Sequence, residues 1–356
     1  MEAVRIRTDQ AEAGMKVASD IYTSNNQLII PKDTVLDERM ITRLRFYNIY
    51  GLLIYRNKPE IKLMEEVSYI EMLRSTPEFK KFNRTYVDTI QNVEDNFSNM
   101  INGNSFDIDN LLAESDRILS EGRNGAHILE MLHGIRNYDD MTFVHSLNVS
   151  LICNVFGGWL KFPAEDIRIL TLAGLLHDIG KMLIPREIIA KPGKLSAEEF
   201  KIVKTHSVKG YQALKDHSID IRVKYAALMH HERCDGSGYP NGFVSEQIDD
   251  FAKIIAIADV YDAMTSNRRY RNAICPFDVV EEFERDGFLK YDPGFLMIFL
   301  ERIVQSYIHN IVRLSDGREG EVIMINRLSL AKPVIRSGNT YIDLSKEHKV
   351  SIVEII

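Results

Sequence analysis

The sequence has little of what marks a secreted, disulfide-bonded or membrane-spanning protein. Its 356 residues include only three cysteines, Cys153, Cys234 and Cys275. An odd number without paired metal-ligand spacing argues against a disulfide framework. No apolar run approaches the roughly 20 residues that span a bilayer, and the first ten residues lack the apolar core of a signal peptide. We therefore expect a reduced, cytoplasmic, globular protein without a membrane span.

Excess positive charge is also missing. Lys and Arg number 44 against 51 Asp and Glu, which gives a formal net charge of −7. This balance argues against broad binding to duplex DNA, which requires an extended basic face, but it is compatible with a local basic pocket for a small anionic ligand. A hydrophobic fraction of 45% and a charged fraction of 27% exclude a wholly disordered chain.

The local patterns predict a multidomain, mainly α protein in four parts. Residues 1–56 mix short apolar runs with turn residues and predict a small α+β module, with strands near residues 28–30 and 52–55 and a helix capped by Asp37. Residues 57–104 predict a helical connector. It is either a dimerisation surface, which would make the protein a homodimer, or a pair of solvated linker helices.

The remaining two parts differ in the secondary structure that their residue patterns predict. Residues 105–307 are a succession of helical stretches and predict an all-α domain. Within it, a capping box at Ser196–Glu199 predicts a helix running to about residue 215, and Asp292-Pro293 predicts the start of the last helix. Residues 308–356 contain hairpin signals around β-rich runs, which predict a small antiparallel sheet or open barrel.

Several histidines and carboxylates lie at the ends of apolar helical stretches. They are His145, His177, His206, His230 and His231, together with Asp178 and Asp259. Neutral imidazole and carboxylate are ligands of Fe, Mn and Zn. A single histidine on an apolar helix is more often a core residue, but burying this many polar groups costs free energy unless each is bonded or bound to metal. The set therefore predicts a metal site.

Two of these positions belong to longer motifs. The run His177-Asp178-Ile179-Gly180-Lys181 resembles the signature of the metal-dependent HD phosphohydrolases, and residues 230–240, HHERCDGSGYP, resemble the extended signature of their HD-GYP subfamily. The resemblance continues through residues 143–146, 204–207 and 259–266, and it covers about 200 of the 356 residues. Both signatures in the same order, with their flanking blocks, are very specific.

The resemblance implies an all-α cyclic di-GMP phosphodiesterase that forms linear pGpG, GMP or both. It also implies two divalent transition metals per chain, Fe or Mn. One would be held by His145, His177, Asp178 and Asp259, and the other by His206, His230 and His231, with Asp178 bridging the pair. A hydroxide bridging the two metals would be the nucleophile, because two cations lower the pKa of a shared water.

The resemblance further implies a set of substrate contacts. Lys181 would meet the scissile phosphate and, with Asp178, form the catalytic pair. Tyr239 would stack on guanine. The other implied contacts are Gly238, Pro240, Asp262, Arg268 and Arg271. For the cations the alternative is a solvated surface residue, and for the loop it is a rigid turn without ligand contact.

One departure from the family pattern bears on the metal count. Some members bind a third metal through a carboxylate four residues before the first histidine. That position is Met141 here, a poor ligand for hard cations. We therefore expect two metals. The other five histidines match no motif and are expected to be structural or surface residues; they are His127, His133, His217, His309 and His348.

Two alternatives to the leading function stay open. The first is a phosphodiesterase for another cyclic or linear nucleotide. The second is a non-catalytic cyclic di-GMP receptor, which a missing ligand would favour, although every ligand expected for two metals is present. The regulatory partner and the input signal are not identified by the sequence.

Overall fold

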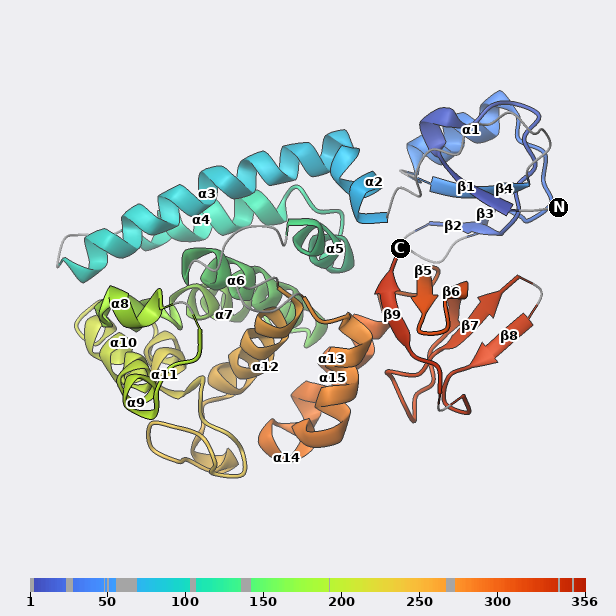
Figure 1. Ribbon diagram of the computed structural model, residues 1–356. Helices are drawn as coiled ribbons and strands as arrows, with labels where there is room; N and C mark the ends of the chain where they lie inside the picture. The colour runs from blue at the N-terminus through green and yellow to red at the C-terminus, as the bar shows by residue number, and fades with distance from the viewer. Residues whose placement is uncertain are drawn as a thin grey trace. The chain divides into compact units, whose positions relative to one another are not determined.

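A computed structural model describes most of the chain (Figure 1). The described residues are 3–23, 28–47, 49, 51–55, 69–102, 107–135, 142–191, 193–266, 273–338, 340–347 and 349–356. The protein is mainly helical, with small sheets near both ends of the chain, as the sequence predicted. Contacts divide it into two compact units, Met1–Lys80 with Ile356, and Lys81–Ile355. The finer division into four parts stays a prediction.

The first unit is built from short strands and one amphipathic helix. Its elements are β1 (Ala3–Arg7), η1 (Thr8–Gln10), β2 (Ile21–Tyr22), β3 (Leu28–Ile30), α1 (Glu38–Phe46), β4 (Gly51–Tyr55) and α2 (Tyr69–Ser75). Strands β1 and β4 pair antiparallel, as do β2 and β3. Ile41 and Leu44 of α1 pack into one buried cluster with Leu52 and Ile54 of β4. The predicted helix after Asp37 and the strand over residues 52–55 are both confirmed.

Helices dominate the second unit up to residue 305. They are α3 (Pro77–Ile101), which begins just before the unit boundary, α4 (Ile108–Leu119), α5 (Gly125–Ile135), α6 (Thr142–Trp159), α7 (Ala164–Leu176), η2 (Ile179–Leu183), α8 (Arg186–Ile189), α9 (Ala197–Lys204), α10 (His206–Leu214), α11 (Ile221–Met229), η3 (Ser245–Gln247), α12 (Asp250–Thr265), α13 (Pro276–Glu282), the π-helical turn η4 (Phe283–Gly287), α14 (Phe288–Lys290) and α15 (Pro293–Gln305). Helix α6 is buried along most of its length, and α7 and α12 pack against it.

The expected long helix after Ser196 is in fact two helices. The capping box is present, because Ser196 Oγ accepts the backbone N–H of Glu199 and the Glu199 carboxylate accepts that of Ser196. The helix ends at Lys204, however, and α10 starts anew at His206. Between them, Thr205 closes a tight turn in which its own N–H and its hydroxyl both donate to the carbonyl of Ile202. The break puts His206 in the first turn of a separate helix.

The last helix and the C-terminal sheet follow the sequence patterns more closely. Asp292 caps α15 by accepting the N–H groups of Gly294 and Phe295. The strands after it are β5 (Ile311–Leu314), β6 (Glu319–Met324), β7 (Val334–Ser337), β8 (Thr340–Asp343) and β9 (Ile352–Ile355), and they form an antiparallel sheet in the order β8-β7-β6-β5-β9.

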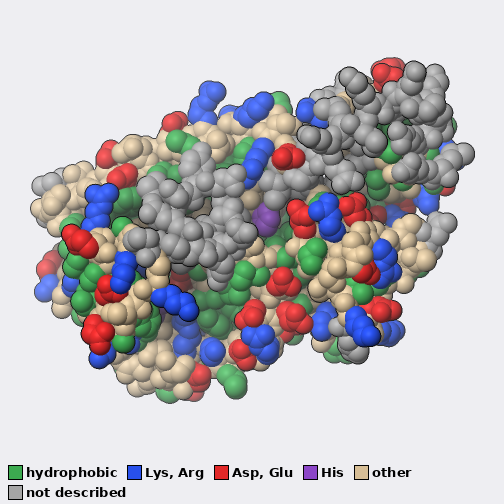
Figure 2. Space-filling model, viewed as in Figure 1, with side chains coloured by type: hydrophobic (Ala, Val, Ile, Leu, Met, Phe, Trp, Pro, Cys, Tyr) green, Lys and Arg blue, Asp and Glu red, His purple; other side chains and the backbone are tan. Residues whose placement is uncertain are grey.

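The surface and the cysteines agree with the compositional expectations. Acidic and basic side chains are intermixed over the described atoms of the face in Figure 2. All three cysteines are unpaired. Among the described residues, no helix has both the length and the apolar character needed to cross a membrane.

Candidate metal centre

Helix ends position the histidines of the predicted metal site. His177 directly follows α7, His230 directly follows α11, and His206 opens α10. Carbonyl groups in the last turn of a helix have no intrahelical partner. Here the Nδ1 atoms of the three rings lie 2.7–2.9 Å from backbone carbonyl oxygens at helix ends, those of Gly174, Val203 and Ala226, of which the Ala226 oxygen also accepts the backbone N–H of His230.

These backbone contacts fix the tautomer of each ring. A carbonyl oxygen can only accept, so Nδ1 of His177, His206 and His230 carries the hydrogen. The Nε2 atom of each neutral ring then presents a lone pair, the form in which imidazole binds a metal. Burial lowers the pKa of His230 to about 4, which keeps that ring neutral near pH 7.

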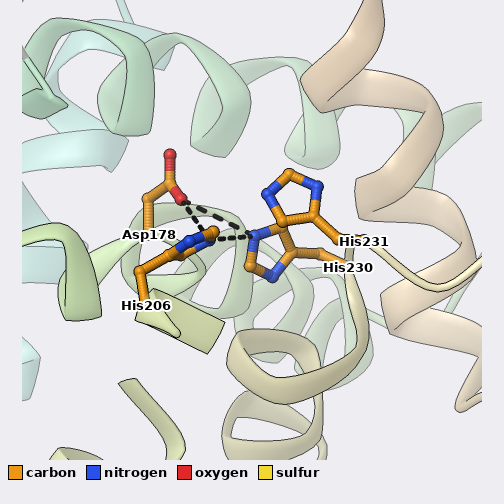
Figure 3. Close-up of side chains that lie close together, drawn as sticks. All are labelled: Asp178, His206, His230 and His231. Carbon is orange, nitrogen blue, oxygen red and sulfur yellow. Dashed lines mark hydrogen bonds and ion pairs between the residues drawn. The ribbon is translucent and has the colours of Figure 1, made fainter. Parts of the chain in front are cut away.

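The lone pairs converge on Asp178, two residues after the end of α7, and Figure 3 shows its carboxylate beside the rings of His206 and His230. Its Oδ1 lies 3.3 Å from Nε2 of His206 and 3.6 Å from Nε2 of His230, and its Oδ2 lies 3.3 Å from Nε2 of His177. Two groups of ligand atoms result, each within 4.8 Å: one of Asp178, His206, His230 and His231, and one of His145, His177 and Asp178. Asp178 is the member that they share.

The chemistry of these donors fits metal ions. The Nε2 atoms of His206 and His230 face each other at 3.2 Å, and both carry lone pairs. The Nε2 atom of His177 and the Oδ1 atom of Asp178 are buried without a hydrogen-bond donor. Facing acceptors repel each other, and buried acceptors without a donor cost free energy, unless a cation lies between them. The predicted ligands are therefore arranged as cation ligands are.

His145 belongs to the group of His177 and Asp178, and it lies in the first turn of the buried helix α6. Its Nε2 lies 2.9 Å from Asp259 Oδ1 and 3.7 Å from Asp178 Oδ2, and its Nδ1 lies 2.7 Å from Asp262 Oδ2. Burial lowers the pKa of His145, but the hydrogen bonds to Asp259 and Asp262 outweigh it and raise the pKa to about 9. Asp259 also lies 3.8 Å from His231, so it touches both groups.

Asp262, for which a substrate contact was expected, has partners within the protein. It is buried, and both carboxylate oxygens are engaged by His145, Asn148 and Ser266. The structure therefore gives Asp262 the task of orienting His145. A contact with substrate stays a prediction.

A close backbone approach brings the two parts of the centre together. A Cβ atom on Gly180 would lie 1.9 Å from the carbonyl oxygen of His206 and 2.5 Å from the backbone nitrogen of Gly210. Only glycine allows η2 and α10 to pack at this distance. This packing holds Asp178, two residues before Gly180, beside His206.

The loop after His231 is anchored by a buried glutamate that the sequence reading did not single out. Glu232 is 2% exposed, and its carboxylate accepts the backbone N–H groups of Asn241 and Phe243. Gly238 lies against the backbone of Glu232, where a Cβ atom would come within 2.4 Å of Cα. The glycine thus closes the loop on itself. The sequence signal was available, because Glu232 directly follows the two predicted ligands.

Tyr239 and Pro240 form the part of this loop next to the histidines. The Tyr239 ring lies 4.7 Å from the His231 ring, centre to centre, and the ammonium group of Lys204 lies 5.6 Å from the centre of the Tyr239 ring. An aromatic face beside the metal ligands and near a cation is compatible with the predicted stacking on a base.

Lys181 lies at the centre but is turned toward Asp178. Its Nζ is 2.5 Å from Asp178 Oδ2, and its side chain is 25% exposed. Burial alone would raise the pKa of Asp178, but the charges of Lys181 and His177 outweigh burial and hold this pKa well below its usual value.

Four residues named in the sequence analysis lie outside the described residues: Arg268, Arg271, Met141 and His348. Of the other unassigned histidines, His309 pairs with Glu321 near the C-terminal sheet.

Comparison with known proteins places this arrangement in a family. A family model described as "HD domain" matches residues 122–294. That segment contains all seven predicted metal ligands. This chain carries an HD domain. The relatives described next confirm the predicted resemblance to the HD-GYP group.

Three relatives illustrate what the HD domain of this chain is similar to. A protein of Pseudomonas aeruginosa named cyclic di-GMP phosphodiesterase is 36% identical over 57% of this chain and 49% of its own length. The cyclic di-GMP phosphodiesterase response regulator RpfG of Xanthomonas campestris is 37% identical over 46% and 43%. The 3′3′-cGAMP-specific phosphodiesterase 1 of Vibrio cholerae is 42% identical over 37% and 31%. The chain thus spans half or less of these relatives.

We predict two metal ions per chain, because two groups of ligand atoms share one carboxylate. Elemental analysis of protein purified without chelator, related to protein concentration, should give about two divalent ions per chain. Chelation should then lower the unfolding temperature, since an ion at a hundredfold its Kd stabilises the folded state by about 2.7 kcal/mol. Three fully occupied positions in anomalous scattering would contradict this prediction.

We also predict that Glu232→Gln loosens the loop. Gln keeps one acceptor oxygen, so one of the two backbone N–H groups loses its partner, at a cost of about 1–2 kcal/mol. Hydrogen exchange at Asn241 or Phe243 should become about 5- to 30-fold faster. The exposed Glu246, in the same loop, offers a control as Glu246→Gln. Equal exchange in both variants would show that Glu232 is not the anchor.

Proposed function

We propose that this protein hydrolyses the phosphodiester bond of cyclic di-GMP to linear pGpG, GMP or both, in a reaction that requires two divalent metals. The observation that carries the proposal is the pair of histidine–carboxylate groups sharing Asp178. Relatives of the HD domain named cyclic di-GMP phosphodiesterases support the substrate. The aromatic and cationic side chains around the pair, Tyr239 and Lys181, suit an anionic nucleotide.

The metal ligands in this proposal are those that the motifs indicated. His145, His177 and Asp259 hold one ion, His206, His230 and His231 hold the other, and Asp178 bridges them. Imidazole and carboxylate donors suit Fe or Mn. Two such ions would supply an activated water and offset the charge that builds on the phosphoryl oxygens.

The chain's own side chains bind and orient the substrate. Lys181 neutralises a phosphoryl oxygen of the scissile phosphate, to which it donates a charge-assisted hydrogen bond. Tyr239 stacks on one guanine, held in place by the loop that Glu232 anchors. Arg268 and Arg271 are proposed to bind the phosphates.

A second substrate has specific support. One relative is named a 3′3′-cGAMP-specific phosphodiesterase, and it is 42% identical to this chain over the part that matches. The two cyclic dinucleotides share the sugar–phosphate ring and one guanine, and they differ in the second base. The residues that would read that base therefore decide between them, whereas the metal ligands do not.

Product analysis tests the proposal. Anaerobically purified protein of known metal content is incubated separately with cyclic di-GMP, 3′3′-cGAMP and linear pGpG, and the products are separated by chromatography. We expect cyclic di-GMP to be consumed fastest, with pGpG or GMP appearing. Faster consumption of 3′3′-cGAMP would identify that dinucleotide, and not cyclic di-GMP, as the preferred substrate. Tight binding of cyclic di-GMP by the metal-loaded protein without any product would indicate a receptor instead.

A further inference from the structure

A chain of buried hydrogen bonds leads from helix α3 to the metal centre. The Tyr86 hydroxyl lies 2.5 Å from Asn148 Oδ1, and the amide Nδ2 of Asn148 lies 3.0 Å from Asp262 Oδ1. The other oxygen of Asp262 lies 2.7 Å from His145 Nδ1. Each of the four side chains is at most 9% exposed, and Tyr86 is fully buried. This series of hydrogen bonds therefore runs through the protein interior, away from competing water.

Each bond in this chain has only one workable direction. A carboxylate accepts, so His145 donates from Nδ1 and Asn148 donates from Nδ2. The amide oxygen of Asn148 then faces Tyr86 and accepts its hydroxyl hydrogen. A flipped amide would place two acceptor oxygens, those of Asn148 and Asp262, against each other. Asp262 thus selects the amide orientation, and the Tyr86 hydroxyl supports it by donating to the amide oxygen.

The last bond sets the metal-binding atom of His145. When Nε2 gives up its hydrogen, as metal binding requires, Asp262 keeps the other hydrogen on Nδ1, and the lone pair is on Nε2, the atom that faces Asp259 and Asp178. Hydrogen-bond partners of ligating histidines fix the tautomer and the ring orientation, and their loss typically weakens metal binding about 10- to 100-fold.

We propose that Tyr86 and Asn148 are positioning residues for the metal centre: through Asp262 they hold His145 in its ligand tautomer and orientation. The inference rests on the proposed function only in that the cluster binds metal. Tyr86 comes from α3, which precedes the matched HD domain of residues 122–294. Part of the metal centre's support thus comes from a helix outside that domain.

Metal affinity, not activity, is the measurement that tests this. Wild type, Tyr86→Phe, Asn148→Leu and the double variant are stripped of metal and titrated with Mn²⁺ by calorimetry. We expect Asn148→Leu to weaken one of two binding events about tenfold, since it removes the direct partner of Asp262. Tyr86→Phe, one bond further away, should weaken the same event about threefold to tenfold. The other event should weaken less, because His145, at which the hydrogen bonds end, belongs to the group of His177 and not to that of His206, His230 and His231.

The double variant separates positioning from general loss of stability. If Tyr86 acts through Asn148, adding Tyr86→Phe to Asn148→Leu should not weaken Mn²⁺ binding further. Thr89→Val is the matched control, because Thr89 is a fully buried hydroxyl on the same helix whose partner is Glu114. This variant should lose stability as Tyr86→Phe does but keep both wild-type Kd values.

Three results would overturn the inference. They are an unchanged Kd in Tyr86→Phe, additive effects in the double variant, and equal weakening by Thr89→Val. Each of these leaves the proposed function standing, since wild type would still bind two ions. A wild-type protein that binds no Mn²⁺, Fe²⁺ or other divalent ion would instead overturn the proposed function and the inference with it.

Discussion

Replacing Asp178 by Ala is expected to abolish turnover and to lower the occupancy of both metal positions. The physical reason is that Asp178 belongs to both groups of ligand atoms, with Oδ1 toward His206 and His230 and Oδ2 toward His177. Losing the shared carboxylate removes a ligand and a negative charge from each position. Since metal ions stabilise the transition-state charge by several kcal/mol, kcat/KM should fall at least about a thousandfold.

The measurement combines elemental analysis with steady-state kinetics on cyclic di-GMP. Asp250→Ala is a matched control, because Asp250 also pairs with a lysine three residues later, Lys253, but at an exposed position. That variant should keep wild-type metal content and rate. Circular dichroism of Asp178→Ala checks that the helices persist. Near-normal activity in Asp178→Ala would remove Asp178 from the mechanism.

The clustering of histidines and carboxylates around Asp178 could be predicted from the sequence because its signal is local. Each predicted ligand belongs to a short block of the HD-GYP pattern, and the blocks occur in the expected order. The structure adds a physical reason: His177 and His230 directly follow helices, so backbone carbonyls of the last helical turn lie close enough to accept a hydrogen bond from each ring. These helix ends also bring the Nε2 atoms of histidines from different helices close together.

What the sequence could not predict depends on contacts between distant residues. The bond from Asn148 to Asp262 joins residues 114 positions apart, and that from Tyr86 to Asn148 joins residues 62 apart. No periodicity or local motif marks such pairs, so the partners of Asp262 within the protein could not be predicted. The break at Thr205 escaped prediction for the opposite reason. Its turn is closed by two hydrogen bonds from one residue to the carbonyl of Ile202, within a sequence that otherwise continues a helix.

Replacing Lys181 by Ala is expected to leave both metals bound and to lower kcat/KM about tenfold to a hundredfold. A charge-assisted hydrogen bond to a phosphate oxygen contributes about 1.5–3 kcal/mol, which corresponds to that range. The structure sharpens the expectation for the metals. The ammonium group lies 2.5 Å from Asp178 Oδ2, so a metal ion that binds this oxygen must displace it. Removing Lys181 therefore removes a competing cation, and the affinity for Mn²⁺ should stay equal to wild type or increase.

Kinetics and metal titration on the same preparation distinguish the role of Lys181 from a structural one. Lys201→Ala, which removes an exposed lysine of α9, should change neither quantity. If Lys181 served mainly to stabilise the buried Asp178 carboxylate, its loss would lower thermal stability and metal content together, and the rate per bound metal would persist. If it binds the phosphate, the rate per bound metal falls while the metal content holds. A kcat/KM within twofold of wild type, at equal metal content, would exclude Lys181 from the catalytic pair.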